Sequence, residues 1–178
     1  MTVPRSLDSV IAVDEIPFDG LRLEVVATEA DRHALADSNG LPSIGSLRAR
    51  LLLRPEGRSG VRVTGDLDAD VVQTCVVTLE PVAARVHETL DVRFAPLGEV
   101  EALRAERAAD PQRDEIDDEP DVIEADGIDV GRLVAEHFTL GLDPYPRKSG
   151  ATLDPAFSEP DERESPFAVL RDRAKPSS

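Results

Sequence analysis

Apolar and polar residues alternate along the middle of the chain, and this period of two is typical of β-strands with one buried face. The alternation runs through residues 47–54, 61–77 and 86–94, and the connecting segments contain glycine and proline residues that favour turns. Three successive strands with short connections predict an antiparallel β-meander in which one face is buried and the other meets water. Residues 21–27 have the same period and predict one more strand.

Helical signals stand on both sides of this meander. Thr28 and Asp31 form a capping-box-like pair ahead of a segment rich in Ala and Leu, and Gly40 supplies a stop signal. Asp129 is placed to cap a second helix, whose apolar residues recur at helical spacing through Leu142 until the prolines of residues 143–146 end it. The predicted fold class is therefore α+β, an antiparallel β-meander with a few helices packed on its apolar face.

The remaining segments set the predicted domain organisation. We expect one domain over residues 1–148 and a flexible tail over residues 149–178, which carries a short apolar motif at 165–171. An acidic, partly disordered insert of about residues 99–126 interrupts the domain and has a net charge of −9. Its first part, through Ala109, has helical composition, whereas residues 110–126 hold too little apolar surface to offset chain entropy and are expected to form a mobile loop.

Charge and composition exclude several classes of function. The 178 residues include 36 acidic and 20 basic side chains, so the formal net charge is −16. Such a field repels phosphate backbones and anionic lipid surfaces, which argues against a simple nucleic-acid clamp, DNA binding or a membrane-surface role. The start of the chain lacks a secretory signal pattern, and no apolar run approaches the roughly 20 residues that span a bilayer, so we expect a cytoplasmic protein.

Residues that could carry chemistry are few. Asp66, Asp68 and Asp70 would line one face of a strand, where they could hold a divalent ion or, as a charged face, prevent edge-to-edge pairing. Cys75, the one cysteine, falls on the inward face of its predicted strand, where a thiol stays protonated and acts as a small apolar group. No histidine stands at a recognisable catalytic spacing from it, so we expect neither an enzyme nor a bound cofactor or metal.

A compact basic spot follows the second helix. Arg147 and Lys148 stand beside Tyr145, and together they could contact RNA by stacking and one or two phosphate bonds. In the alternative interpretation, Tyr145 packs over the end of the helix and the two cations balance its negative dipole end.

Three motifs, in the same order, resemble an alphaproteobacterial-type member of the YceD family, also called the large ribosomal RNA subunit accumulation protein family. They lie at residues 73–82, at 132–136 with 142–148, and at 166–170. The candidate binding residues in these motifs are Cys75, Leu79, Glu80, Pro81, Asp143, Pro144, Tyr145, Pro146, Arg147, Lys148, Pro166, Phe167, Val169 and Leu170. Many members have a Cys-x-x-Cys pair where this chain has Cys75 and Thr78, so the resemblance supplies no metal site here.

The resemblance implies a bacterial factor needed for synthesis, processing or accumulation of large-subunit ribosomal RNA. The expected partners are basic ribosomal proteins or large-subunit precursor particles, because a strongly acidic chain favours encounter with basic surfaces. Contact with RNA is expected to be indirect. The alternatives are a metal-dependent hydrolase acting on RNA through the three aspartates, and a regulatory protein-binding module outside ribosome assembly. We also expect residues 167–170 to dock on a groove of this chain or of a partner.

Overall fold

The structure, a computed structural model, describes residues 2–109, 119–124 and 127–152. Its main feature is a six-stranded sheet with the strand order β1-β3-β4-β5-β6-β7, accompanied by a second sheet that pairs β2 with β8. The elements in chain order are β1 (Val3–Arg5), β2 (Val10–Ile11), a short 3₁₀ helix (Val13–Glu15), β3 (Leu21–Val26), α1 (Glu29–Asn39), β4 (Ser43–Glu56), β5 (Gly60–Thr74), β6 (Pro81–Ala95), α2 (Leu97–Ala109), β7 (Asp121–Val122), β8 (Ile128–Asp129) and α3 (Val130–Leu140).

The meander predicted from the alternation is confirmed, and the fold is α+β. Strands β3, β4, β5 and β6 pair antiparallel with their neighbours in sequence. Along β5, Val61, Val63 and Leu67 are completely buried, while Arg62, Thr64 and Asp66 point to the opposite face. Because side chains alternate strictly along a strand, this register divides the sheet into an inner apolar face and an outer polar face.

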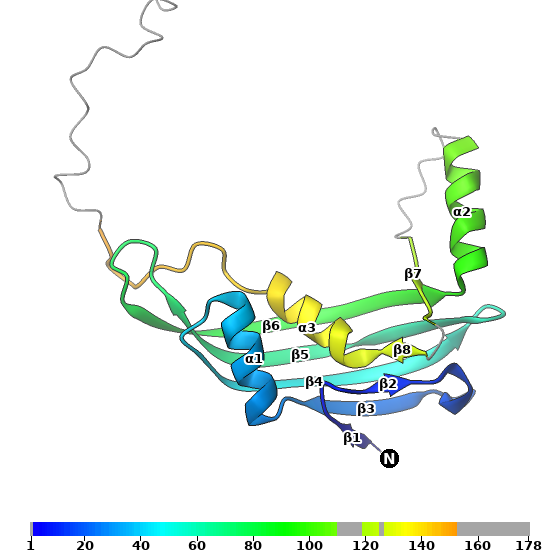
Figure 1. Cartoon of the computed structure of the whole chain (residues 1–178), viewed down its shortest axis with the longest axis horizontal. Coiled ribbons are helices and arrows are strands. Elements are labelled where there is room, and N and C mark those ends of the chain that lie inside the picture. Colours follow the sequence, from blue (N-terminus) through cyan, green and yellow to red (C-terminus); the bar gives the residue numbers. More distant parts are fainter. Residues whose placement is uncertain (1, 110–118, 125–126, 153–178) are drawn as a thin grey trace, which may run out of the picture.

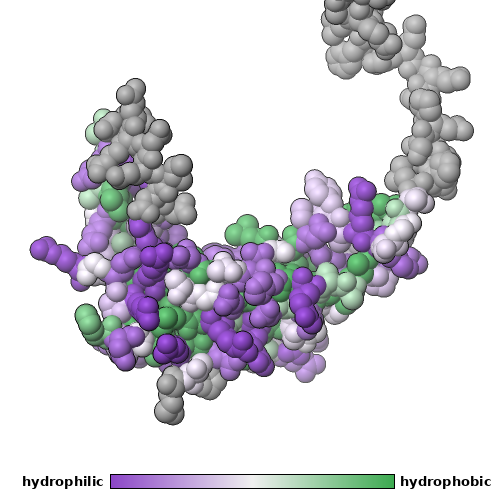
Figure 2. All heavy atoms as spheres, turned by 180° about the vertical axis from the view of Figure 1, so that it is seen from behind, coloured by the Kyte–Doolittle hydropathy of each residue, from purple (hydrophilic) through white to green (hydrophobic). Residues whose placement is uncertain are grey.

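The inner face is covered by one layer of other elements. Figure 1 shows α1, α3 and the β2–β8 pair together on this side of the long curved sheet. The buried side chains form a single core that extends from Ile11 in β2 to Phe138 in α3. The outer face has no such cover within the described residues, and Figure 2 shows hydrophilic side chains spread over it.

Both predicted helices have the caps expected from the sequence. Thr28 and Asp31 form a capping box at the start of α1, and Gly40 ends that helix in the left-handed conformation with φ 64°. Asp129 caps α3 through a 2.8 Å bond that its Oδ1 accepts from the Arg132 N–H. Helix α3 was expected to continue through Leu142 but ends at Leu140. A Cβ at Gly141 would lie 2.6 Å from Cγ of Glu88 in β6, so glycine allows the end of the helix to pass close to the sheet.

The prediction of a mobile loop over residues 110–126 was wrong for residues 119–124. Within them, β7 adds to the sheet beside the end of β6, where Phe94 pairs with Asp121 and Ala95 with Val122 in parallel. The N–H of Ile123 also donates to the carbonyl of Ala95 at 2.9 Å. A two-residue strand is too short to show a period, and backbone hydrogen bonds supply its order. Residues 110–118 and 125–126 lie outside the described residues.

The first part of the acidic insert is helical, as its composition predicted. Helix α2 begins at Leu97, directly after β6, and in Figure 1 it projects from one end of the sheet. Val100 is its buried anchor. An ion pair of 2.6 Å between Nη2 of Arg104 and Oε1 of Glu119 joins the helix to the segment that precedes β7. This end of the molecule carries α2 and β7, whereas the turn between β5 and β6 lies at the other end.

Candidate functional site

The turn between β5 and β6 contains the first group of candidate residues. Strand β5 was expected to reach residue 77 but ends at Thr74. In the turn that follows, the N–H of Cys75 donates to the carbonyl of Glu80 at 2.9 Å. The N–H of Leu79 donates to the carbonyl of Cys75 at 2.9 Å. Leu79 has a positive φ of 58°, a conformation that non-glycine residues seldom adopt, and its side chain is 76% exposed. The turn therefore holds a large apolar side chain in water.

The second group of candidates lies against this turn, although it is about 70 residues away in sequence. The side-chain amide of Gln73 donates to the carbonyl of Asp143 at 2.8 Å. The N–H of Val76 donates to the carbonyl of Pro146 at 2.9 Å. We call the two segments, residues 73–81 and 143–148, the hairpin-end cluster. The structure thus brings together two of the three motifs that carried the resemblance.

The thiol of Cys75 lies at the centre of the hairpin-end cluster and has no exposed surface. Its Sγ accepts hydrogen bonds from the backbone N–H groups of Lys148 at 3.3 Å and Thr78 at 3.4 Å. The pKa of the Cys75 thiol is lowered to about 6. The hydrogen bond from the Lys148 N–H has the largest effect, the hydroxyl and N–H of Thr78 add to it, and burial opposes it. The expected burial of Cys75 is confirmed. Cys75 lies in the turn after β5 and not within the strand, and its lowered pKa differs from the expectation of a protonated thiol.

The free energy of unfolding is expected to rise with pH, because the pKa of the Cys75 thiol differs between the folded and unfolded chain. The pKa of Cys75 is about 6 in the folded chain and near its ordinary value of 9.0 in the unfolded chain. Between these values the unfolded state binds more protons, so stability increases with pH and is lost as pH falls through 6. Urea titrations over this range should show the increase for the wild type but a smaller one for Cys75→Ser, whose hydroxyl accepts the same bonds without titrating. An equal pH dependence in both proteins would contradict the prediction.

An ion pair closes the hairpin-end cluster at its surface. Nζ of Lys148 donates to Oε2 of Glu80 at 2.8 Å. The pair raises the pKa of Lys148 and lowers the pKa of Glu80. Lys148 is therefore paired with a carboxylate of the turn, rather than with the end of the helix. Tyr145 is 71% exposed, so the interpretation in which it packs over the helix end is wrong.

The exposed surface of the hairpin-end cluster is partly apolar. Leu79 and Tyr145 are joined there by Val76, which is 45% exposed. Arg147 is also exposed, whereas Pro81 begins β6. Sequence reasoning did not single out Gln73 and Val76 as site residues. The signal for Gln73 was present, since an amide occupies an inward position in the alternation of β5 and is only 5% exposed.

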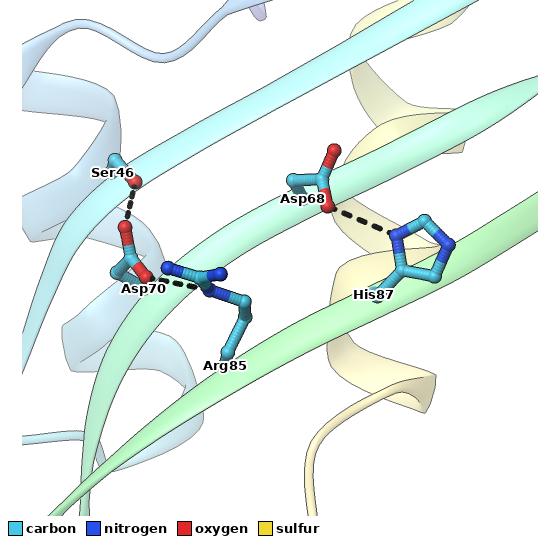
Figure 3. A network of polar contacts seen from close by, with 5 residues as sticks. All are labelled: Ser46, Asp68, Asp70, Arg85 and His87. Carbon is cyan, nitrogen blue, oxygen red and sulfur yellow. Dashed lines mark hydrogen bonds and ion pairs between the residues drawn. The ribbon is translucent and has the colours of Figure 1, made fainter.

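The three aspartates of β5 lie on the outer face and have basic or hydroxyl partners there. Figure 3 shows the partners of Asp68 and Asp70, and Oδ1 of Asp66 accepts from the Thr89 hydroxyl at 3.5 Å. Asp68 Oδ1 lies 2.9 Å from Nδ1 of His87, and the hydrogen bond with Asp68 raises the pKa of that histidine. Asp70 bonds Ser46 at 2.8 Å and Arg85 at 3.2 Å, and these bonds lower its pKa. The arrangement is a set of cross-strand pairs on a flat surface, and within the described residues no group of three or more metal-ligating side chains is gathered.

The remaining candidates, Pro166, Phe167, Val169 and Leu170, lie outside the described residues, as do residues 153–178 as a whole. The docking of residues 167–170 therefore stays a prediction. Among the helices of the described segments, none has the length and apolar character needed to cross a membrane.

Fold and site together define an α+β protein in which two distant motifs form one exposed, partly apolar cluster at the end of a long sheet. A model of the family described as large ribosomal RNA subunit accumulation protein YceD matches residues 63–172. The match covers more than half of the chain, which therefore belongs to the YceD family. This membership supports a role in ribosome biogenesis. No curated protein and no solved structure matches the chain.

Proposed function

We propose that the chain is a non-enzymatic ribosome-biogenesis factor, which supports the synthesis, processing or accumulation of large-subunit ribosomal RNA. In this proposal it acts by binding basic ribosomal proteins or large-subunit precursor particles. The hairpin-end cluster is the observation that carries the proposal. Its polar groups bond one another, as Lys148 does with Glu80, while Val76, Leu79 and Tyr145 face water. Exposed aromatic and aliphatic side chains with a polar rim are typical of a protein-binding surface.

Charge supports the same kind of partner. The net charge of −16 and the acidic insert produce a field that attracts basic ribosomal proteins and repels other acidic proteins. Complementary fields raise the rate of encounter and orient the partners, and salt screens them. In this proposal the acidic insert accelerates association, and the hairpin-end cluster holds the complex once it has formed.

Affinity recovery from cells tests this function. Tagged full-length protein, recovered at low salt, is expected to carry large-subunit ribosomal proteins or precursor particles that dissociate as the salt concentration rises. Bound protein and RNA are identified at each step. If only partners unrelated to ribosomes were recovered, the proposed function would be wrong and a regulatory module outside ribosome assembly would take its place.

A double variant and a control variant test whether the recovered partners bind at the hairpin-end cluster. Leu79→Asn removes the apolar side chain but retains a residue that tolerates a positive φ. Combined with Tyr145→Ser, it is expected to lower recovery at least tenfold without lowering the melting temperature. Val13→Asn is the matched control, because Val13 is 37% exposed and lies in the 3₁₀ helix, outside the hairpin-end cluster. Equal recovery by the double variant and the control would locate the contact elsewhere.

A further inference from the structure

The long strand β6 has no neighbouring strand along most of one edge. The six-stranded sheet ends in β1 on one side and in β7 on the other. β7 pairs only with Phe94 and Ala95, and Figure 1 shows it beside the end of β6 alone. Over residues 81–93, β6 pairs with β5 on one side, while on the other side no strand of the described segments pairs with it. We call this side of residues 81–93 the open edge of β6.

Backbone groups of every second residue point out of the open edge. In an antiparallel pair, successive residues of a strand direct their N–H and C=O groups to opposite sides. The carbonyl of Glu80 accepts from Cys75 on the β5 side, whereas the carbonyl of Ala95 accepts from Ile123 on the β7 side. The register between β5 and β6 has no bulge, so the odd-numbered residues point outward. Within the described residues, these have no backbone partner there: Ala83, Arg85, His87, Thr89, Asp91 and Arg93.

The opposite edge of the same sheet has features that prevent pairing with another chain. β1 has only three residues, Val3–Arg5, and its central residue is Pro4, which has no N–H. Residues 82–93 of β6 contain neither proline nor lysine. A long edge without these features or a bulge is a template for one more strand, and β7 already uses its last two positions.

Side chains on the inner face of β6 would be covered by such a strand. Ala84 and Val92 are partly buried and pack against the core. Between them stands Glu88, which pairs with Leu67 of β5 and is also partly buried. Since directly opposed side chains point to the same face, an added strand would place its own inward-facing side chains beside these residues. Its inward-facing positions must therefore suit two apolar groups and one carboxylate.

Glu88 lies in a place that favours a cation. It makes no ion pair or hydrogen bond with any residue that the structure describes. Its carboxylate lies at the end of α3, since a Cβ at Gly141 would be 2.7 Å from Oε1 of Glu88. The C-terminal end of a helix carries partial negative charge, so the carboxylate and the helix end both attract a Lys or Arg side chain. A second copy of this chain is a poor source of that cation, because its net charge is −16.

We infer that the open edge of β6 binds an extended, basic segment of a partner protein as an additional strand of the sheet. Backbone hydrogen bonds to the odd-numbered residues hold the segment, and Glu88 with the end of α3 selects a Lys or Arg at an inward-facing position. The inference deepens the proposed function and rests on it for the identity of the partner in the cell. Pro81 begins the open edge and belongs to the hairpin-end cluster, so one partner can contact both.

Binding is tested with purified full-length protein and the fluorescein-labelled peptide Thr-Val-Thr-Lys-Thr-Val-Thr-Lys, by anisotropy. Saturable binding is expected below about 1 mM peptide. Two N-methylated peptides have the same charge, one with methyl groups on the two central threonines and the other on the first lysine and the following valine. Because a strand directs successive N–H groups to opposite sides, only one of them keeps the donors that face β6. That peptide should bind within threefold of the unmodified one, and the other at least tenfold more weakly.

Variants of the protein test the same contact from the other side. Thr89→Pro removes an outward-pointing N–H and leaves the bonds to β5, whereas the control Thr89→Ala keeps that N–H. Proline is expected to weaken peptide binding at least tenfold, and alanine less than twofold. Glu88→Gln should weaken it at least fivefold, and Glu15→Gln, which removes the same charge from the 3₁₀ helix, less than twofold. If Thr89→Pro fails to fold, the methylated peptides still decide the matter with the wild type.

Equal binding of the two methylated peptides, or no saturable binding below about 1 mM, would overturn the inference. So would equally tight binding of a peptide with glutamate in place of lysine, because Glu88 would then select no cation. A dimer of the chain that Thr89→Pro abolishes would assign the open edge to a second copy and overturn it as well. None of these results bears on affinity recovery from cells. Conversely, peptide binding as expected, with no large-subunit component recovered from cells, would refute the proposed function and leave the assignment of the edge intact.

Discussion

Replacing Phe138 with alanine is expected to lower the free energy of unfolding by about 3–5 kcal/mol. Phe138 is completely buried in α3 and belongs to the core that joins this helix to the inner face of the sheet. Its removal loses the transfer free energy of the ring and leaves a cavity that the surrounding long strands cannot fill by a small shift. The chain continues from α3 into residues 143–148, so the change should also loosen the hairpin-end cluster.

Urea denaturation measures this loss, and Leu140→Ala is its control. Leu140 lies on the same helix but is 80% exposed, so its truncation is expected to change the free energy of unfolding by no more than about 0.5 kcal/mol. Faster hydrogen exchange at the Val76 and Lys148 N–H groups of Phe138→Ala would report the loosened cluster. A loss below about 1 kcal/mol would show that Phe138 is not the anchor of this helix.

The substitution Gly131→Ala is expected to lower the free energy of unfolding by at least about 3 kcal/mol, at the upper end of the effects of overpacking. A Cβ at this position would lie 1.6 Å from the carbonyl oxygen of Leu7. The obstacle is backbone and is held in place, because the N–H of Val130 donates to the carbonyl of Ser9 at 3.1 Å and β2 pairs with β8 just beyond. The N-terminal segment must therefore move away from α3.

The matched control is Gly98→Ala. Gly98 is the second residue of α2, as Gly131 is of α3, but a Cβ there would meet nothing within 4 Å. Alanine at an open helical position reduces the entropy of the unfolded chain, so this variant should be more stable by about 0.4–1 kcal/mol. Thermal or urea unfolding should thus show effects of opposite sign for the same substitution. Effects of the same sign would contradict the close approach at Gly131.

The long strands could be predicted because their alternation is local and repeated. In β5, the polar residues that alternate with buried valines and leucines all indicate the same outer face. Errors at the strand ends therefore do not change which residues in the middle of the strand are assigned to that face. The capping residues Thr28 and Asp129 act within three residues of their partners, and they too were predictable. The strands β1, β2, β7 and β8 were not predicted, because two or three residues show no period.

The sequence predicted the residues of the candidate site but not that they lie together in the fold. The motifs around Cys75 and Tyr145 were recognised separately, and nothing in their spacing indicates that the Lys148 N–H bonds the Cys75 thiol. A row of arginines across three strands of the outer face was hidden for the same reason. Arg54, Arg62 and Arg93 each appear as an ordinary polar residue in an alternating strand, and only the register of three strands brings them into one row.

By itself, the sequence determined the α+β class, the meander and its inner and outer faces, the caps of α1 and α3, and membership of the YceD family. These follow from local periodicity, from bonds over three or four residues, and from motifs read in order. The tertiary structure alone decided the hairpin-end cluster, the close approach of Gly131 to Leu7, and the cross-strand row of arginines. Each of these depends on contacts between segments far apart in the chain, and the relative position of such segments is set by strand register and core packing, which no local pattern encodes.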